Sequence, residues 1–110
     1  MRRRYIAVTV ASPHTLKDRD LMNAIWESVH RLFGELGASQ TALSFIEYNE
    51  LQNRLILRCS HDAVDSVRAA IAAITTIHKA PTALHVTNIS GTLKRLRVTV
   101  EAHTQKGHSR

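Results

Sequence analysis

The chain has 110 residues, with 15 Lys or Arg against 9 Asp or Glu, a net charge of +6 and 44% hydrophobic residues. This length fits one compact domain, residues 1–110, and excludes a large multidomain enzyme. Its apolar runs fall far short of the roughly 20 residues that a membrane helix needs, so no membrane association is expected. The single cysteine, Cys59, cannot form an internal disulfide, which favours a reducing, cytoplasmic location.

The positive charge lies at the two ends of the chain. Residues 2–4 are three arginines, residues 90–110 hold five basic residues against one acidic residue, and residues 5–89 are nearly neutral. A neutral body with basic ends is typical of a polyanion-binding protein, although terminal arginines can also serve solubility alone. We predict a basic N-terminal arm over residues 1–4 and a disordered tail over residues 105–110.

The hydrophobic pattern predicts a strand followed by a long helix. Residues 5–11 alternate with the period of a strand. Thr15 is the predicted N-cap of the amphipathic helix, with Asp18 at its third position. Gly34 and Gly37 are predicted to end this helix, because glycine adopts the left-handed conformation without a Cβ clash.

The second half of the chain shows two further strands, a helix and a fourth strand. Two β-rich runs, residues 42–48 and 54–59, are joined by a connection short enough for a hairpin. Ser60 or Asp62 is predicted to cap the second helix. Residues 84–89 have the pattern of a strand.

This order of elements is that of the ferredoxin-like βαββαβ sandwich, an α+β fold shared with the RNA recognition motif (RRM). Both helices are expected on one face of a four-stranded antiparallel sheet. From residue 92 onward the apolar spacing favours a C-terminal helix over a strand. Ser90 is its predicted cap, and Lys94, Arg95 and Arg97 fall in its first turns.

The sequence offers no self-sufficient catalytic or metal site. The seven histidines form no metal-binding pair and no grouping with Cys59 at zinc-ligand spacing. We expect Cys59 to be a buried, inert thiol. Asp18 and Asp20 lie where capping of the first helix explains them. The loop over residues 11–15 lacks the glycine that a phosphate-binding loop needs.

An RRM stacks single-stranded bases on aromatic residues of its central strands, and the corresponding strand of this chain lacks them. The strand at residues 54–59 has none, and aromatic residues make up 5% of the chain. We therefore expect Arg and Lys to contact the phosphates and 2′-hydroxyls of a folded RNA, in place of base stacking.

Six segments in order, spread over residues 3–97, resemble a known family. They are residues 3–7 (RRYIA), 32–37 (LFGELG), 46–48 (IEY), 55–59 (LILRC), 64–71 (VDSVRAAI) and 89–94 (ISGTLK). Together they are similar to the archaeal ribonuclease P protein component 2 family, which is homologous to the eukaryotic Pop-five/Rpp-fourteen group. The hairpin departs from the family, with Asn49 in place of aspartate and Asn53 in place of glycine. Asparagine tolerates the positive φ of such a turn.

The resemblance implies an RNA-binding subunit of the ribonucleoprotein endonuclease, a hydrolase, that removes the 5′ leader of precursor tRNA. In that family the catalytic centre belongs to the RNA and its Mg²⁺ ions, so the chain itself would hold no cofactor and no catalytic residue. It would pair with a TIM-barrel-like protein subunit, and two such pairs would join into a heterotetramer. Together these proteins would stabilise the ribonuclease P RNA and meet precursor tRNA only indirectly.

Charge and resemblance together assign RNA contact to six basic residues: Arg2, Arg3, Arg4, Lys94, Arg95 and Arg97. Arg58 and Arg68 also match family segments, and each is assigned either to RNA, to an ion pair with Glu47 or Asp65, or to a protein interface.

Apolar surface on the open sheet face or the long helix is expected to bind the partner protein, with Ile56 and Trp26 as its predicted residues. The alternative from another class is a ferredoxin-like regulatory or ligand-binding module without an RNA role. Such a module predicts a glycine in the first strand-to-helix loop and no concentration of charge at the ends. The sequence meets neither expectation.

Overall fold

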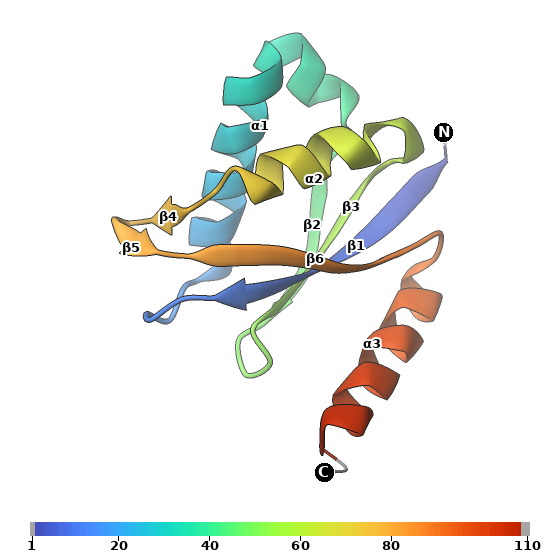
Figure 1. The fold of residues 1–110 in the computed structure, drawn as a ribbon. Helices are drawn as coiled ribbons and strands as arrows, with labels where there is room; N and C mark the ends of the chain where they lie inside the picture. Colours follow the sequence, from blue (N-terminus) through green and yellow to red (C-terminus); the bar gives the residue numbers. More distant parts are fainter. Residues whose placement is uncertain (1, 109–110) are drawn as a thin grey trace.

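The structure is a computed structural model that describes residues 2–108, with side chains described over residues 2–100. Four antiparallel strands form the main sheet in the order β2 (Ser44–Asn49), β3 (Arg54–Ser60), β1 (Arg3–Ala11) and β6 (Ala83–Ser90). The helices are α1 (Asp18–Gln40), α2 (Val64–Ala72) and α3 (Leu93–His108). Helices α1 and α2 cover one face of the sheet, and α3 lies against the other (Figure 1). The predicted ferredoxin-like order with a C-terminal helix is confirmed.

Strand β1 begins at Arg3, two residues before the strand predicted from the sequence. Arg3 and Arg4, which were expected in a basic arm, already pair with β3. The pairing continues beyond the strand, because the backbone N–H of His61 donates to the carbonyl of Arg2 at 2.8 Å. The positive charge at this end of the chain is therefore held on the sheet.

Helix α1 begins at Asp18, so its N-cap is Lys17 and not the predicted Thr15. Leu16, just before the cap, and Leu21, the fourth helical residue, are both buried in the main core. This spacing is that of a hydrophobic staple, which fixes the direction in which the chain enters a helix. The start of α1 is marked by this apolar pair and by the Asp20 carboxylate, which accepts from the N–H of Lys17, and not by a hydroxyl cap.

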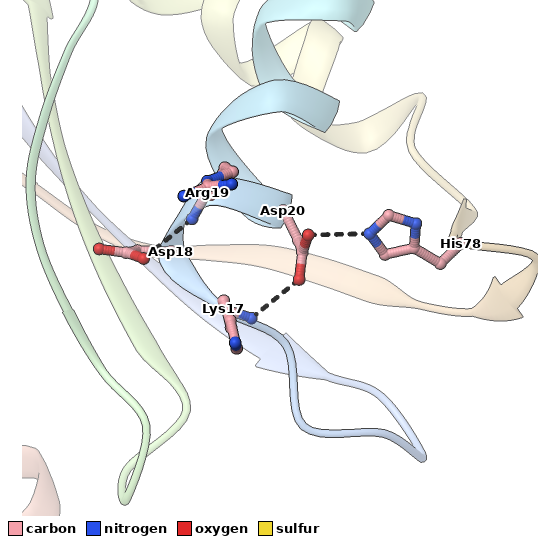
Figure 2. Close-up of polar contacts among 5 residues, drawn as sticks. All are labelled: Lys17, Asp18, Arg19, Asp20 and His78. Carbon is pink, nitrogen blue, oxygen red and sulfur yellow. Dashed lines mark hydrogen bonds and ion pairs between the residues drawn. The ribbon is translucent and has the colours of Figure 1, made fainter.

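A small hairpin that was not predicted from the sequence is tied to the first turn of α1. It pairs β4 (Thr76–Ile77) with β5 (Ala80–Pro81), and both residues of the turn between them have positive φ. Nε2 of His78 in this turn lies 2.8 Å from the carboxylate of Asp20, which also accepts a hydrogen bond from the backbone N–H of Lys17 at 3.1 Å (Figure 2). The contact with His78, followed by that with Lys17, holds the pKa of the Asp20 carboxyl below its ordinary value of 3.8.

Helix α1 bends at Gly34, where φ is 74° and ψ is 178°. The predicted break at Gly34 is confirmed, because its positive φ interrupts the helix. The predicted end at Gly37 is wrong, because a second helical segment follows the break and buries Ala38 in the main core. Glycine at position 34 permits the positive φ. At Gly37 it permits close approach, since a Cβ there would lie 2.7 Å from the Cβ of Phe33.

Helix α2 follows β3 through a 3₁₀ turn, η1 (His61–Ala63). Neither predicted cap of α2 is its N-cap, because Ser60 precedes this turn and Asp62 lies within it. Ser60 makes no side-chain capping bond, and α2 starts after Ala63. The hairpin between β2 and β3 is as predicted, with Asn53 in the positive-φ conformation (φ 51°).

Helix α3 is capped by Thr92, whose hydroxyl accepts a hydrogen bond from the backbone N–H of Arg95 at 3.2 Å. The predicted cap, Ser90, is the last residue of β6, and its hydroxyl accepts from the N–H of Thr92 at 3.4 Å. Helix α3 extends to His108 and so includes the first part of the predicted disordered tail. Residues 109–110 of that tail lie outside the described residues.

The sheet buries apolar side chains on both faces. The main core lies between the sheet and helices α1 and α2, and includes Ile6, Val8, Leu55 and Leu57. A second group, which we call the α3 cluster, consists of Ala7, Ile56, Leu96 and Val100. The expectation of an open sheet face is therefore wrong where the apolar side of α3 covers it.

Replacing Leu96 by alanine is expected to destabilise the fold by about 2–4 kcal/mol, because a side chain only 1% exposed leaves a cavity when it is shortened. Val98→Ala is the matched control on the outer side of α3, where the residue is 59% exposed, and should change stability by about 0.5 kcal/mol or less. Urea unfolding followed by circular dichroism measures both values. Equal effects of the two substitutions would contradict the docking of α3.

Asp20 is expected to contribute to the loss of stability in acid. A carboxyl with a lowered folded-state pKa stabilises the fold while ionised, and this contribution is lost as the pH falls from the ordinary value of 3.8 through the folded value. Asp20→Asn should therefore flatten the decline of the melting temperature in this range. Asp18→Asn, in the same helical turn, should retain the decline. Parallel pH curves for the wild type and Asp20→Asn would contradict the assignment.

Candidate nucleic-acid interface

The two basic ends of the chain meet at one end of the sheet. Tyr5 of β1 pairs with Ser90, the last residue of β6, so residues 2–4 lie beside the loop that leads into α3 (Figure 1). A Cβ on Gly91 in this loop would lie 3.6 Å from Nη1 of Arg4. We call the surface formed by Arg2, Arg3, Arg4, Lys94 and Arg95 the basic corner.

The cations of the basic corner lie on more than one side of the sheet. Because side chains alternate along a strand, Arg3 is on the face covered by α3, and Arg4 is on the face covered by α1 and α2. Arg4 is half-buried, and its Nη1 donates to the carbonyl of Arg3 at 3.0 Å. The other four residues, Arg2, Arg3, Lys94 and Arg95, are exposed. The corner thus presents positive charge around the end of the sheet.

Arg97, the sixth predicted RNA contact, is engaged in an ion pair outside the basic corner. Its Nη2 lies 2.6 Å from Oε1 of Glu47 on β2, and its Nε donates to the same oxygen at 3.1 Å. The side chains are 52% and 42% exposed, so the pair contributes about 1 kcal/mol or less to stability. Its geometry joins α3 to an edge strand and compensates the charge of Arg97.

Arg58 and Arg68, the two residues with several predicted roles, differ in position. Arg58 is half-buried on β3 opposite Tyr5, and its Nη2 donates to Oγ of Ser44 at 3.5 Å, a long and therefore weak hydrogen bond. Arg68 is exposed on α2. Over residues 2–100, neither arginine forms an ion pair, so the predicted pairs with Glu47 and Asp65 are absent there.

The two residues predicted to bind a partner protein are also separated by the structure. Ile56 is 4% exposed beneath α3, so it belongs to the α3 cluster and not to an open surface. Trp26 is half-buried against the main core, with its ring centroid 5.6 Å from that of His30. The large apolar side chains that are exposed are Leu32, Phe33, Leu36, Leu51 and Val98. Three of them surround the bend in α1.

The side chains that the structure describes include no group of three metal-ligating residues close enough to hold an ion. Cys59 is fully buried, and this burial raises the pKa of its thiol to about 11. A thiol with such a pKa is almost entirely protonated at neutral pH and is a poor nucleophile. In the described part of the chain, no helix combines the length and hydropathy needed to span a bilayer.

These features define a ferredoxin-like α+β domain with a helix on its sheet and a cationic surface at one sheet end. The chain belongs to the Rpp14/Pop5 family, whose sequence model matches residues 4–100. The match extends from β1 into α3 and confirms the resemblance inferred from the six sequence segments.

Several archaeal proteins named ribonuclease P protein component 2 are similar to this chain. The one from Methanobrevibacter smithii is 30% identical over 105 residues, covering 89% of this chain and 88% of its own length. The one from Pyrococcus abyssi is 31% identical over 94 residues, covering 86% and 80%. A chain of the solved structure of yeast ribonuclease MRP superposes with a TM-score of 0.70 at 13% identity, covering 99% of this chain and 96% of that one. This likeness shows a shared fold.

Cys59 is expected to resist thiol reagents in the folded protein. Raising the pKa from the ordinary value of 9.0 to about 11 lowers the thiolate fraction at pH 8 about 100-fold. The reaction with a disulfide reagent such as DTNB should be slower in native buffer than in denaturant by at least this factor. Similar rates under the two conditions would show that the thiol is accessible.

Proposed function

We propose that this chain is an RNA-binding protein subunit of ribonuclease P, and that it stabilises the catalytic RNA that removes the 5′ leader of precursor tRNA. The observation that carries the proposal is the basic corner, which the fold assembles from opposite ends of the chain. Family membership and the names of the relatives, at 30–31% identity, support the assignment to this ribonucleoprotein.

The basic corner would act by neutralising phosphates that the folded RNA brings close together. Arg2, Arg3, Lys94 and Arg95 are exposed, and their binding to phosphates releases condensed counterions. The RNA then needs less Mg²⁺ to hold its active conformation. Leader cleavage is assigned to the RNA and its Mg²⁺ ions, and this chain is assigned no catalytic residue and no cofactor of its own.

The proposed protein partner is a TIM-barrel-like subunit of ribonuclease P, and two such pairs would form a heterotetramer. Leu32, Phe33 and Leu36 offer an exposed apolar surface around the bend in α1, and Leu36 is 73% exposed. Exposed apolar surface of this kind is typical of protein interfaces. Trp26 lies on the same helix. The free thiol of Cys59 suits a cytoplasmic location.

Removing the charges of the basic corner is expected to weaken the binding of ribonuclease P RNA and its dependence on salt. Loss of one phosphate contact lowers the slope of log affinity against log salt by nearly one unit. The Arg2→Ala, Arg3→Ala, Arg4→Ala triple variant should therefore lose roughly two to three units of slope, and Lys94→Ala with Arg95→Ala roughly one to two. Filter binding over a salt series measures the slopes.

The matched control removes the same charge elsewhere, with Arg19→Ala, Arg31→Ala and Lys79→Ala together, all three at exposed positions. In a particle reconstituted from the RNA, the partner subunit and this chain, the Mg²⁺ needed for leader cleavage should rise in the corner variants and not in the control. The chain alone should leave precursor tRNA intact. Unchanged salt slopes and Mg²⁺ requirements in both corner variants would show that the RNA is held elsewhere.

A further inference from the structure

Four polar side chains form a continuous row across the main sheet, beside the basic corner. Ser44 of β2 pairs with Arg58 of β3, Arg58 pairs with Tyr5 of β1, and Tyr5 pairs with Ser90 of β6. Paired residues on antiparallel strands project to the same face, and Tyr5 packs against the α3 cluster. All four therefore lie on the face that α3 partly covers. We call these four residues the Tyr5 row.

The hydrogen-bonding groups of the Tyr5 row are only weakly used by the fold. All four residues are half-buried. Arg58 donates to Ser44 at 3.5 Å, and Ser90 accepts from the backbone of Thr92 at 3.4 Å, both at the long limit of a hydrogen bond. Within residues 2–100, the hydroxyl of Tyr5 has no hydrogen-bond partner. The row thus has donors and acceptors available to a ligand.

The charge around the Tyr5 row is positive. The four strands of the main sheet contain four arginines and a single acidic residue, Glu47. That carboxylate is bound by Arg97. Arg3 shares the face of the row and is two residues from Tyr5, and Lys94 lies in the first turn of α3, beyond Ser90. An anionic ligand at the row therefore meets no uncompensated carboxylate on these strands.

We propose that the Tyr5 row binds one unpaired nucleotide of the ribonuclease P RNA, a contact that rests on the proposed function and adds a specific site to it. The ring of Tyr5 stacks on the base, and the guanidinium of Arg58 binds the adjoining phosphate. The hydroxyls of Ser44 and Ser90 bond to the ribose or the base edge. Aromatic stacking combined with guanidinium contacts is a common way to hold unpaired RNA bases.

Helix α3 limits the site to a single nucleotide. Leu93 and Tyr5 both pack against the α3 cluster, in which Leu96 and Val100 lie with Ala7. The middle of the sheet face, where further bases would stack on an open sheet, is therefore occupied by the helix. The row remains as a polar margin next to the basic corner.

The chemistry of the row favours RNA over a protein partner. Its side chains are two serines, an arginine and a tyrosine, whereas the exposed apolar residues that suit a protein lie around the bend in α1. The row was not predicted from the sequence because the strand at residues 54–59 lacks an aromatic residue, and the ring is supplied by β1.

The test compares RNA affinity and its salt dependence in Tyr5→Leu and Arg58→Ala, using the full chain with its partner subunit and ribonuclease P RNA. Tyr5→Leu should weaken binding about 10-fold with an unchanged salt slope, because base stacking releases no counterions. Arg58→Ala should weaken binding and lower the slope by about one unit. Tyr5→Phe keeps the ring, and Arg31→Ala removes an exposed arginine from α1, so both should bind nearly as the wild type does. Melting temperatures check that each variant is folded.

Footprinting at nucleotide resolution provides the second readout. Tyr5→Leu and Arg58→Ala should lose protection of the same unpaired nucleotide, and both controls should keep it. Wild-type affinity and footprints in both variants, while the basic-corner variants still bind weakly, would overturn the nucleotide site and leave the proposed function intact. Loss of partner binding with RNA contacts unchanged would also overturn it, by making the row a protein interface. Failure of the unmodified complex to bind the RNA would overturn both proposals.

Discussion

The backbone pairing of β1 with both β3 and β6 is the constraint on which the rest of the structure depends. It sets the alternation that sends Ile6 and Val8 to the main core and Tyr5 and Ala7 to the α3 side. The register that places Tyr5 opposite Ser90 also brings the basic ends together. A shift of one residue would exchange the two faces, moving the apolar side chains out of the core. Core and candidate interface are thus fixed by one set of hydrogen bonds.

The two sides of helix α3 differ in burial and charge. Leu96 and Val100 face the sheet and are buried, whereas Lys94 and Arg95 are exposed. The ion pair of Arg97 joins the helix to the edge strand β2. The cations are therefore presented from a helix anchored by apolar contact, which holds them in a defined position relative to β1.

The order of elements could be predicted from the sequence because the hydrophobic periodicity of each strand and helix is strong. The β4–β5 hairpin could not, since its turn places His78 and Lys79 at positive φ, where glycine or asparagine is the usual signal. Gly34 correctly indicated a break, but a second helical segment follows it and buries Ala38. The local preference is therefore obeyed at Gly34, whereas the segment beyond it is stabilised by tertiary packing.

The candidate interface could be predicted only in part, because the positions of its residues also depend on tertiary packing. Charge alone identified both basic segments, but their meeting depends on the pairing of residues distant in sequence. The pairing of Arg97 with Glu47, the burial of Ile56 and the row through Tyr5 all depend on where α3 lies on the sheet. No local pattern specifies that position, because the same apolar spacing would suit packing on another surface.

The position of β1 in the middle of the sheet has a consequence for synthesis on the ribosome. The strand is translated before its partners, which are residues 54–60 and 83–90. At about 5–20 residues per second, its apolar side chains wait on the order of seconds for those partners to emerge. Helix α3 follows all four strands of the main sheet in the chain and completes the cationic surface. The proposed RNA-binding surface is therefore complete only after α3 has been synthesised, later than the sheet that positions it.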